Sequence, residues 1–155
     1  MDNSFGIITA ASVGVVVFLL LIILAIYVVY AIALAKIFKK AGEEGWKAII
    51  PFYNLFVLIQ ISGLNWWYFL IAISGTICAM LNINGLSYVC NLAALAVNFF
   101  IFYNLAKKMK QQPVVFAVAA IFVAPIVTMI LGFSSKYSYD STVQVSPNGP
   151  IDSNK

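Results

Sequence analysis

The sequence predicts an all-α integral membrane protein with four transmembrane helices and one amphipathic re-entrant or interfacial helix. Of the 155 residues, 63% are hydrophobic and 9% are charged, and the mean hydropathy is +1.00, whereas a soluble domain carries about 25% charged residues. Four apolar runs are long enough for a bilayer core, which takes about 20 helical residues. Lysines gather beside these runs in two groups, at residues 36–47 and 107–110, as is typical of charges that set membrane topology.

The predicted membrane domain covers residues 1–133. Its first helix lies in the apolar run from Phe5 to Ile37, which is too long, and lacks the basic start, for a cleavable signal peptide. The spans are predicted at about residues 11–35, 66–81, 86–105 and 114–132. Pro113 suits the first turn of the last span, and Pro125 predicts a kink within it.

The second and third spans are joined by the four residues "NING", 82–85. Asn and Gly tolerate the left-handed backbone of tight turns, and short turns make neighbouring helices antiparallel. We therefore expect a hairpin in which Cys78 and Cys90, each six positions from Asn84, are neighbours at similar depth. Packed helix axes lie roughly 8–10 Å apart, so we favour two free thiols over a disulfide.

Residues 44–62 are apolar but do not have the pattern of a span. Pro51 cannot donate a backbone hydrogen bond and disfavours helix at the residue before it. The three tryptophans, Trp46, Trp66 and Trp67, bracket the segment, and tryptophan prefers the membrane–water boundary. We therefore expect a helix after Pro51 that lies flat or dips shallowly into the membrane.

The same interpretation fixes the predicted topology. If residues 44–62 crossed, the two lysine groups would face opposite sides, although cytoplasmic loops carry the excess of lysine. Four spans place both groups in the cytoplasm and both termini outside. Residues 134–155 are rich in Ser, Asn, Pro and Gly and predict a flexible polar tail, anchored at its start by Tyr137 and Tyr139.

The stretch "KKAGEEGWKAIIPFYNLFVLIQISGLNWWYFL", over residues 39–70, resembles a family of small prokaryotic multi-pass membrane proteins of unknown function. The membrane segment of that family also occurs ahead of some signal peptidase I-like domains. The resemblance implies a four-helix membrane unit and a prokaryotic source, and it supplies no catalytic residue, because the peptidase dyad belongs to a downstream domain. It rests on Ala41, Gly42, Gly45, Trp46, Ile49, Ile50, Pro51, Tyr53, Asn54, Gly63, Trp66 and Trp67.

Polar residues recur at helical spacing in the second and third spans. Those of the second span are Ser74, Cys78 and Asn82, and those of the third are Ser87, Asn91 and Asn98. In a hairpin the two faces can oppose each other. One interpretation is a polar path or a small-molecule site. The other, which we favour, is hydrogen bonding between helices, worth about 0.6–2 kcal/mol per contact.

The composition also narrows the function. The chain has no histidine and no arginine, and no Asp, Glu, Lys or Arg falls inside a predicted span, although coupled transporters and pumps usually need such a group there. We expect no enzyme activity, no cofactor and no metal. The lysine groups flank apolar runs and form no extended basic face, so a nucleic-acid partner is not expected.

The leading hypothesis is a scaffold or accessory subunit of the prokaryotic inner (cytoplasmic) membrane. It would contact the lipid bilayer and bind a protein partner, or copies of itself. The alternative is a homo-oligomeric pore or small-solute channel. The candidate interface residues are Trp46, Pro51, Tyr53, Asn54, Trp66 and Trp67, and the candidate intramembrane polar face is Ser74, Cys78, Asn82, Asn91 and Asn98.

Overall fold

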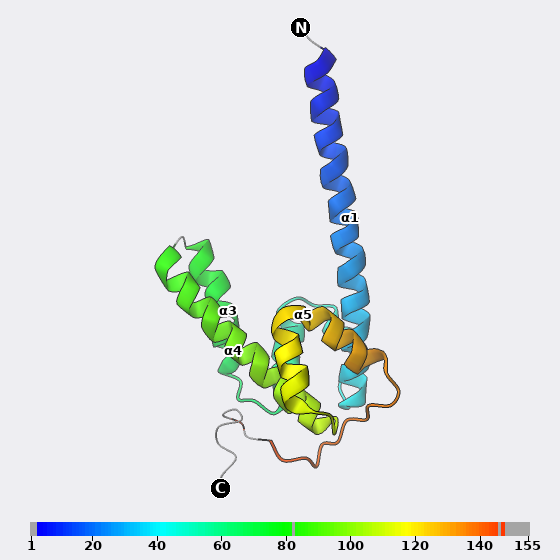
Figure 1. Cartoon of the computed structure of the whole chain (residues 1–155), viewed down its shortest axis with the longest axis vertical. Helices are drawn as coiled ribbons and strands as arrows, with labels where there is room; N and C mark the ends of the chain where they lie inside the picture. Colours follow the sequence, from blue (N-terminus) through cyan, green and yellow to red (C-terminus); the bar gives the residue numbers. More distant parts are fainter. Residues whose placement is uncertain (1–2, 82, 146, 148–155) are drawn as a thin grey trace.

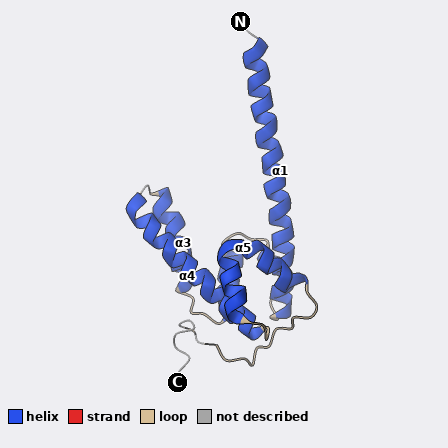
Figure 2. Cartoon of the chain, viewed as in Figure 1, coloured by secondary structure: helices blue, strands red, loops and turns tan. Residues whose placement is uncertain are grey.

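The computed structural model describes residues 3–81, 83–145 and 147, and every regular element in this part of the chain is helical (Figure 2). The prediction of an all-α chain is therefore confirmed over the described residues. The α-helices are α1 (Asn3–Lys40), α2 (Tyr53–Ser62), α3 (Tyr68–Met80), α4 (Asn84–Lys108) and α5 (Pro113–Phe133), and a short 3-10 helix, η1 (Gly45–Ala48), precedes α2.

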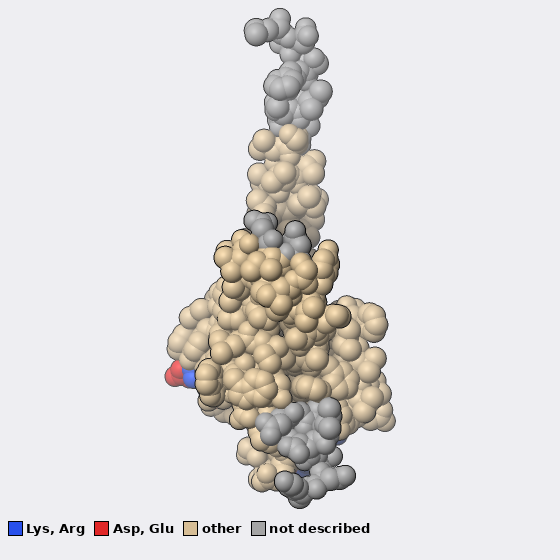
Figure 3. All heavy atoms as spheres, turned by 90° about the vertical axis from the view of Figure 1, so that its left-hand side faces the viewer, with Lys and Arg blue, Asp and Glu red and all other residues tan. Residues whose placement is uncertain are grey.

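Three helices are long and apolar enough to cross a membrane, namely α1, α4 and α5. The predicted set of four spans is not confirmed, because the region of the second span forms α3, a helix of only 13 residues. The α3–α4 side of the molecule presents a face with almost no charged side chain (Figure 3). These features suggest a membrane protein.

The core lies at the end of the molecule where α1 finishes with Lys39 and Lys40. Here the last turns of α1 bury Leu34, Ile37 and Phe38 against α2, the second half of α4 and α5. The preceding part of α1 projects away from the other helices (Figure 1), and its apolar side chains from Val13 to Leu24 are exposed. The chain is thus packed at one end and open at the other.

Helices α3 and α4 lie side by side and lean away from α1 (Figure 1). The predicted hairpin is confirmed, and the Sγ atoms of Cys78 and Cys90 are 3.7 Å apart as free thiols. The approach is close because Gly75 has no side chain. A Cβ there would lie 2.5 Å from Oδ1 of Asn91.

Helix α5 is an arch, although it is long enough to cross. Its backbone leaves the helical region at Val123 (φ −138°, ψ 46°), two residues before Pro125. The kink expected from Pro125 is therefore present, and it turns the chain back. The second half of α5 descends to the end of α1, where Nζ of Lys40 donates to the carbonyls of Leu131 and Ser134, both at 2.7 Å (Figure 1).

The arch changes the expected position of the C-terminal segment. Residues 134–145 run past the lysine-bearing ends of α1 and α4, where the amide of Asp140 donates to the carbonyl of Lys108 at 2.9 Å. The start of α1 at Asn3 lies at the opposite end of the molecule (Figure 1). The expected placement of both termini on one side of a membrane is not confirmed, since the second half of α5 turns back toward the end of α1 in the described chain.

Candidate functional site

A row of stacked aromatic rings connects η1, α2 and α3. Trp46 in η1 stacks on Tyr53 with ring centroids 6.2 Å apart, Tyr53 stacks on Phe56 at 6.3 Å, and Phe56 meets the edge of Phe69 in α3 at 5.7 Å. The indole nitrogen of Trp46 donates to a carboxylate oxygen of Glu44 at 2.8 Å. Trp46 and Tyr53, two of the predicted interface residues, are thus brought together, and both remain more than a third exposed.

The turn before α2 is held by contacts on both sides. Pro51 lies in this turn and not in the helix, since α2 begins at Tyr53 and Phe52 adopts a positive φ of 64°. The Asn54 amide donates to the carbonyl of Ala48 at 3.3 Å. A positive φ is rare outside glycine, so Phe52 has an uncommon backbone conformation at the start of α2.

Trp66 and Trp67 lie in the turn between α2 and α3. The turn follows Gly63, whose φ of 83° is a left-handed conformation that ends α2. Trp66 is 66% exposed, and Trp67 is 40% exposed while stacking on Tyr68 with centroids 4.1 Å apart. These two tryptophans therefore form a second exposed aromatic surface, distinct from the row that begins at Trp46.

Charges beside the first aromatic row are paired. Nζ of Lys47 lies 2.6 Å from a carboxylate oxygen of Glu43 and 3.9 Å from one of Glu44. The hydrogen bond that Lys47 donates to Glu43 is the main cause that raises the pKa of Lys47. These two acidic residues therefore counterbalance the charge of Lys47.

The predicted polar face divides into groups with different surroundings. Ser74 donates to the carbonyl of Ile71 in its own helix at 2.7 Å, so its hydroxyl does not reach α4. Cys78 meets Cys90, and Asn91 packs against Gly75, which places all four at the α3–α4 contact. These groups stabilise the hairpin. The remaining residue of the second-span face, Asn82, lies outside the described residues.

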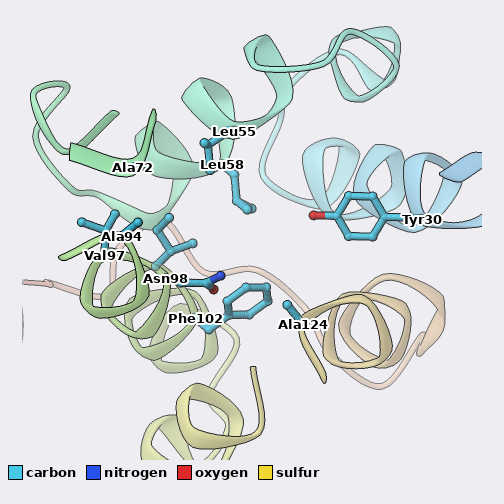
Figure 4. A pocket seen from close by; sticks show the side chains of 10 residues that line it. Tyr30, Leu55, Leu58, Ala72, Ala94, Val97, Asn98, Phe102 and Ala124 are labelled. Atoms are coloured by element: carbon cyan, nitrogen blue, oxygen red, sulfur yellow. The ribbon is translucent and has the colours of Figure 1, made fainter. Parts of the chain in front are cut away.

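Asn98 is separate from the other polar residues. It lies on α4 and lines a cavity of about 170 Å³ together with residues of α1, α2, α3 and α5. Its Oδ1 is buried and has no hydrogen-bond partner among the described residues. Figure 4 shows its amide pointing into the cavity, opposite the hydroxyl of Tyr30. Of the predicted polar residues, Asn98 thus has the surroundings of a binding group.

A lysine cluster escaped the sequence prediction. Lys108 is buried, and its Nζ donates to the carbonyl of Ile61 at 2.9 Å and to the hydroxyl of Tyr139 at 3.0 Å. The Tyr139 hydroxyl itself donates to the Ile61 carbonyl at 2.7 Å. Lysines near helix C-termini commonly bond the free carbonyls of their own helix, but the carbonyl that Lys108 bonds belongs to Ile61 of another helix, α2.

The C-terminal segment adds an ion pair to this cluster. Oδ2 of Asp140 lies 2.9 Å from Nζ of Lys110, and Oδ1 accepts a 2.6 Å hydrogen bond from the Thr142 hydroxyl. The bonds from Thr142, and then the bond from Lys110, lower the pKa of Asp140 to about 2. Residues 139–142 thus attach the C-terminal segment to the lysine end of α4.

Among the described residues, no three side chains of His, Cys, Asp or Glu lie close enough together to hold a metal ion.

Residues 46–142, more than half of the chain, match a protein family described as "Family of unknown function (DUF5684)". No curated protein and no solved structure matches the chain. The matched region begins at Trp46 and contains the aromatic rows, the hairpin, the cavity residue Asn98 and the Lys108 cluster.

Proposed function

The chain belongs to DUF5684, a family of unknown function, and we propose that it is a small non-enzymatic membrane protein that acts as a scaffold or accessory subunit. In this proposal it resides in the inner (cytoplasmic) membrane of a prokaryote and binds a membrane partner. It takes no cofactor and no nucleic acid.

The observation that carries the proposal is the pair of separated apolar arms. The projecting part of α1 and the outer part of the α3–α4 hairpin diverge from a shared packed base (Figure 1). Of the most apolar 18-residue window of α1, only 6% is buried within the chain. Lipid alone could cover such arms, but two rigid arms on one base also suit a partner helix placed between them, because helix packing is the main stabilising contact available in a bilayer.

The aromatic surfaces fit the same proposal. Tryptophan and tyrosine are enriched both at membrane boundaries and in protein interfaces. Four exposed ones, Trp46, Tyr53, Trp66 and Trp67, lie in η1, at the start of α2 and in the α2–α3 turn, whereas Tyr88 is exposed on α4 within the hairpin arm. We propose that the first four contact the cytoplasmic boundary of the membrane and the adjoining part of the partner.

We also propose a topology with three crossings, by α1, α3 and α4, and with α5 as a re-entrant arch. The lysine end is cytoplasmic, since cytoplasmic loops carry the excess of lysine. Helix α3, with 13 residues, is shorter than the roughly 20 residues of a full span. It would cross together with its antiparallel neighbour α4, with the adjoining turns and local thinning of the bilayer making up the length.

A homo-oligomeric pore or small-solute channel stays our second proposal, and the polar lining that Asn98 gives to the cavity favours it. Against it, Cys78, Cys90 and Asn91 lie in the contact between α3 and α4. They are therefore not available to line a path between subunits.

Site-specific photocrosslinking in native membranes separates these proposals. A photoreactive residue replacing Phe18, which is 63% exposed on the α1 arm, should yield one defined protein adduct of reproducible mass. The matched control replaces Phe122, which is 81% exposed at the bend of α5, and should yield mainly lipid adducts. Adducts only with further copies of this chain would favour the pore, and lipid adducts alone from Phe18 would refute the scaffold.

A further inference from the structure

The ends of α1 and α4 carry positive charge that few carboxylates balance. The carboxylates of the described residues belong to Glu43, Glu44 and Asp140, and the first two are paired with Lys47. Asp140 is therefore the carboxylate that remains for the lysines at the ends of the two helices. These lysines are Lys36, Lys39, Lys40, Lys107, Lys108 and Lys110.

Asp140 holds the position of a bound anion at the end of α4. Its Oδ2 lies 2.9 Å from Nζ of Lys110, and its Oδ1 accepts hydrogen bonds from the amide and the hydroxyl of Thr142 at 3.0 and 2.6 Å. The side chain of Lys110 is 69% exposed, and exposed ion pairs contribute little to stability. A second anion can therefore reach Lys110 and compete with the carboxylate.

The backbone at Lys110 is unusual for a lysine. Its φ of 54° is left-handed, and its amide donates to the carbonyl of Lys107 at 3.1 Å, just after the last turn of α4. Helices commonly end with glycine in this conformation, because a side chain makes it less favourable. An outlier of this kind is a reason to look for a function of the side chain, which here is a cation placed directly beyond the helix.

This cation lies at the expected depth of lipid headgroups. The apolar span of α4 ends at Lys108, two positions before Lys110. The C-terminal segment also reaches the α2–α3 turn, where the amide of Asn65 donates to the carbonyl of Pro147 at 3.4 Å, next to the exposed Trp66. Tryptophan prefers the membrane–water boundary. Each lysine near an anionic membrane surface strengthens attachment by about fivefold.

We propose that the phosphate of an anionic phospholipid, of the phosphatidylglycerol class, exchanges with the Asp140 carboxylate on Lys110 and frees residues 141–145 from α4. The C-terminal segment is then an internal competitor of the lipid. The buried bonds of Lys108 to Ile61 and Tyr139 remain and keep the segment tethered. This inference rests on the proposed position of the lysine end at the membrane boundary. It does not depend on the partner-binding arms, so a failure of the crosslinking at Phe18 leaves it standing.

Lipid retention tests the exchange directly. Native mass spectrometry of the full chain, titrated in mild detergent with phosphatidylglycerol or phosphatidylcholine, gives an apparent affinity for each lipid. Asp140→Asn removes the competitor and should raise the affinity for phosphatidylglycerol about three- to tenfold, whereas Lys110→Gln should lower it by a similar factor. Partial unfolding cannot imitate this result, because it would change both variants in the same direction.

Matched variants separate the site from net charge. Glu44→Gln makes the same change of charge as Asp140→Asn at a side chain that accepts from Trp46, and Lys39→Gln matches Lys110→Gln on the last turn of α1. Both controls should change the affinity for phosphatidylglycerol by less than about twofold. Equal effects of Glu44→Gln and Asp140→Asn overturn the proposal, as does an unchanged affinity in Lys110→Gln.

A nitroxide at Ser141, with Cys78 and Cys90 replaced by serine, tests the release of the segment. The label should be immobile in phosphatidylcholine nanodiscs, and the mobile fraction should at least double when phosphatidylglycerol is included. The same label at Val89, exposed on α4, should not respond. Glycerol 3-phosphate added to phosphatidylcholine discs supplies the soluble phosphate and should leave Ser141 immobile. Equal release by this soluble ester overturns the lipid assignment, and no release by phosphatidylglycerol overturns the exchange.

Discussion

Glycines at helix contacts show how single methyl groups decide the packing of this chain. A Cβ built on Gly132 of α5 would lie 2.4 Å from the carbonyl oxygen of Ala33 in α1, whereas one built on Gly85 of α4 would meet nothing within 4 Å. Backbone atoms of a packed helix cannot move aside as a flexible side chain does. The second half of α5 therefore rests on α1 at a distance that only glycine permits.

Gly132→Ala should destabilise the packed base. Overpacking of this kind costs about 1–3 kcal/mol, and the two helices must separate to relieve it. Thermal unfolding of the purified chain in mild detergent should show a lower midpoint for Gly132→Ala. Gly85→Ala is the control and should leave the midpoint unchanged or slightly higher, since alanine favours helix. An unchanged midpoint for Gly132→Ala would mean that α5 does not pack on α1 as described.

Asp140 gives the C-terminal segment a pH dependence. Its pKa is lowered from 3.8 to about 2, mainly by the Thr142 hydrogen bond and then by Lys110. Because the pKa is lower in the folded chain, the carboxylate stabilises the contact above pH 3.8, and this stabilisation is lost as the pH falls through about 2. A nitroxide at Ser141 should therefore be immobile at neutral pH and become mobile across this window.

The matching variant removes the titration. In Asp140→Asn the label at Ser141 should already be mobile at neutral pH and should change little on acidification. The same label at Val89, exposed on α4, reports any general effect of acid on the nanodisc. A label that stays immobile in Asp140→Asn would show that Tyr139 and the backbone bond to Lys108 hold the segment without the carboxylate.

At the scale of helices, hydropathy identified which segments are apolar but not how each helix is oriented or bent in the folded chain. The predicted third and fourth spans, 86–105 and 114–132, correspond to α4 and α5. The sequence also predicted the kink of α5 through Pro125. The return of α5 to α1 after this kink could not be predicted. It depends on the contact of Gly132 with Ala33 and on the hydrogen bond from Lys40 to Leu131, and in both pairs the residues are about 90 or more positions apart.

In the candidate site too, contacts within one hairpin could be predicted from the sequence, whereas contacts between helices far apart in the sequence could not. Helical spacing correctly placed Cys78 beside Cys90. The same spacing grouped Asn98 with Asn91, yet only Asn98 lines a cavity, because that cavity exists where α1, α2 and α5 approach the second half of α4. Periodicity within one hairpin carries no information about those three helices.

The Cys78 and Cys90 pair provides a prediction for the α3–α4 hairpin. With the Sγ atoms 3.7 Å apart, a small rotation of the side chains brings them to the bonding distance of about 2.0 Å. Mild oxidation with copper phenanthroline should therefore form a disulfide within one chain, visible by mass spectrometry of the unreduced protein. A short thiol-specific bifunctional reagent should join the same pair.

A displaced cysteine supplies the control for this prediction. In Cys90→Ser/Tyr88→Cys the new thiol lies on an exposed part of α4, and crosslinking to Cys78 within one chain should fall several-fold. If both pairs react equally, the hairpin rotates freely and the contact between Gly75 and Asn91 is not fixed.

At the scale of the whole molecule, one packed base brings together the end of α1, α2, parts of α4 and α5, and the C-terminal segment. The core cluster, the Lys108 and Tyr139 contacts and the Lys40 contacts all lie at the end where α1 and α4 finish. The other end consists of helices that touch few neighbours. This asymmetry is what a chain with one lysine-rich side and one apolar side would show if its partner joined it within the bilayer.

The re-entrant arch of α5 predicts which segments share a side of the membrane. Single cysteines at Glu44, at Ile83 and at Ser141, in a background with Cys78 and Cys90 replaced by serine, report on the turn after α1, the α3–α4 turn and the C-terminal segment. In intact cells an impermeant maleimide should label Ile83→Cys only, because Glu44 and Ser141 belong to the lysine end, where Asp140 bonds Lys108 and Lys110. After permeabilisation all three should react. Labelling of Ser141→Cys from outside, with Glu44→Cys still protected, would mean that α5 crosses the bilayer and that the arch opens in the membrane.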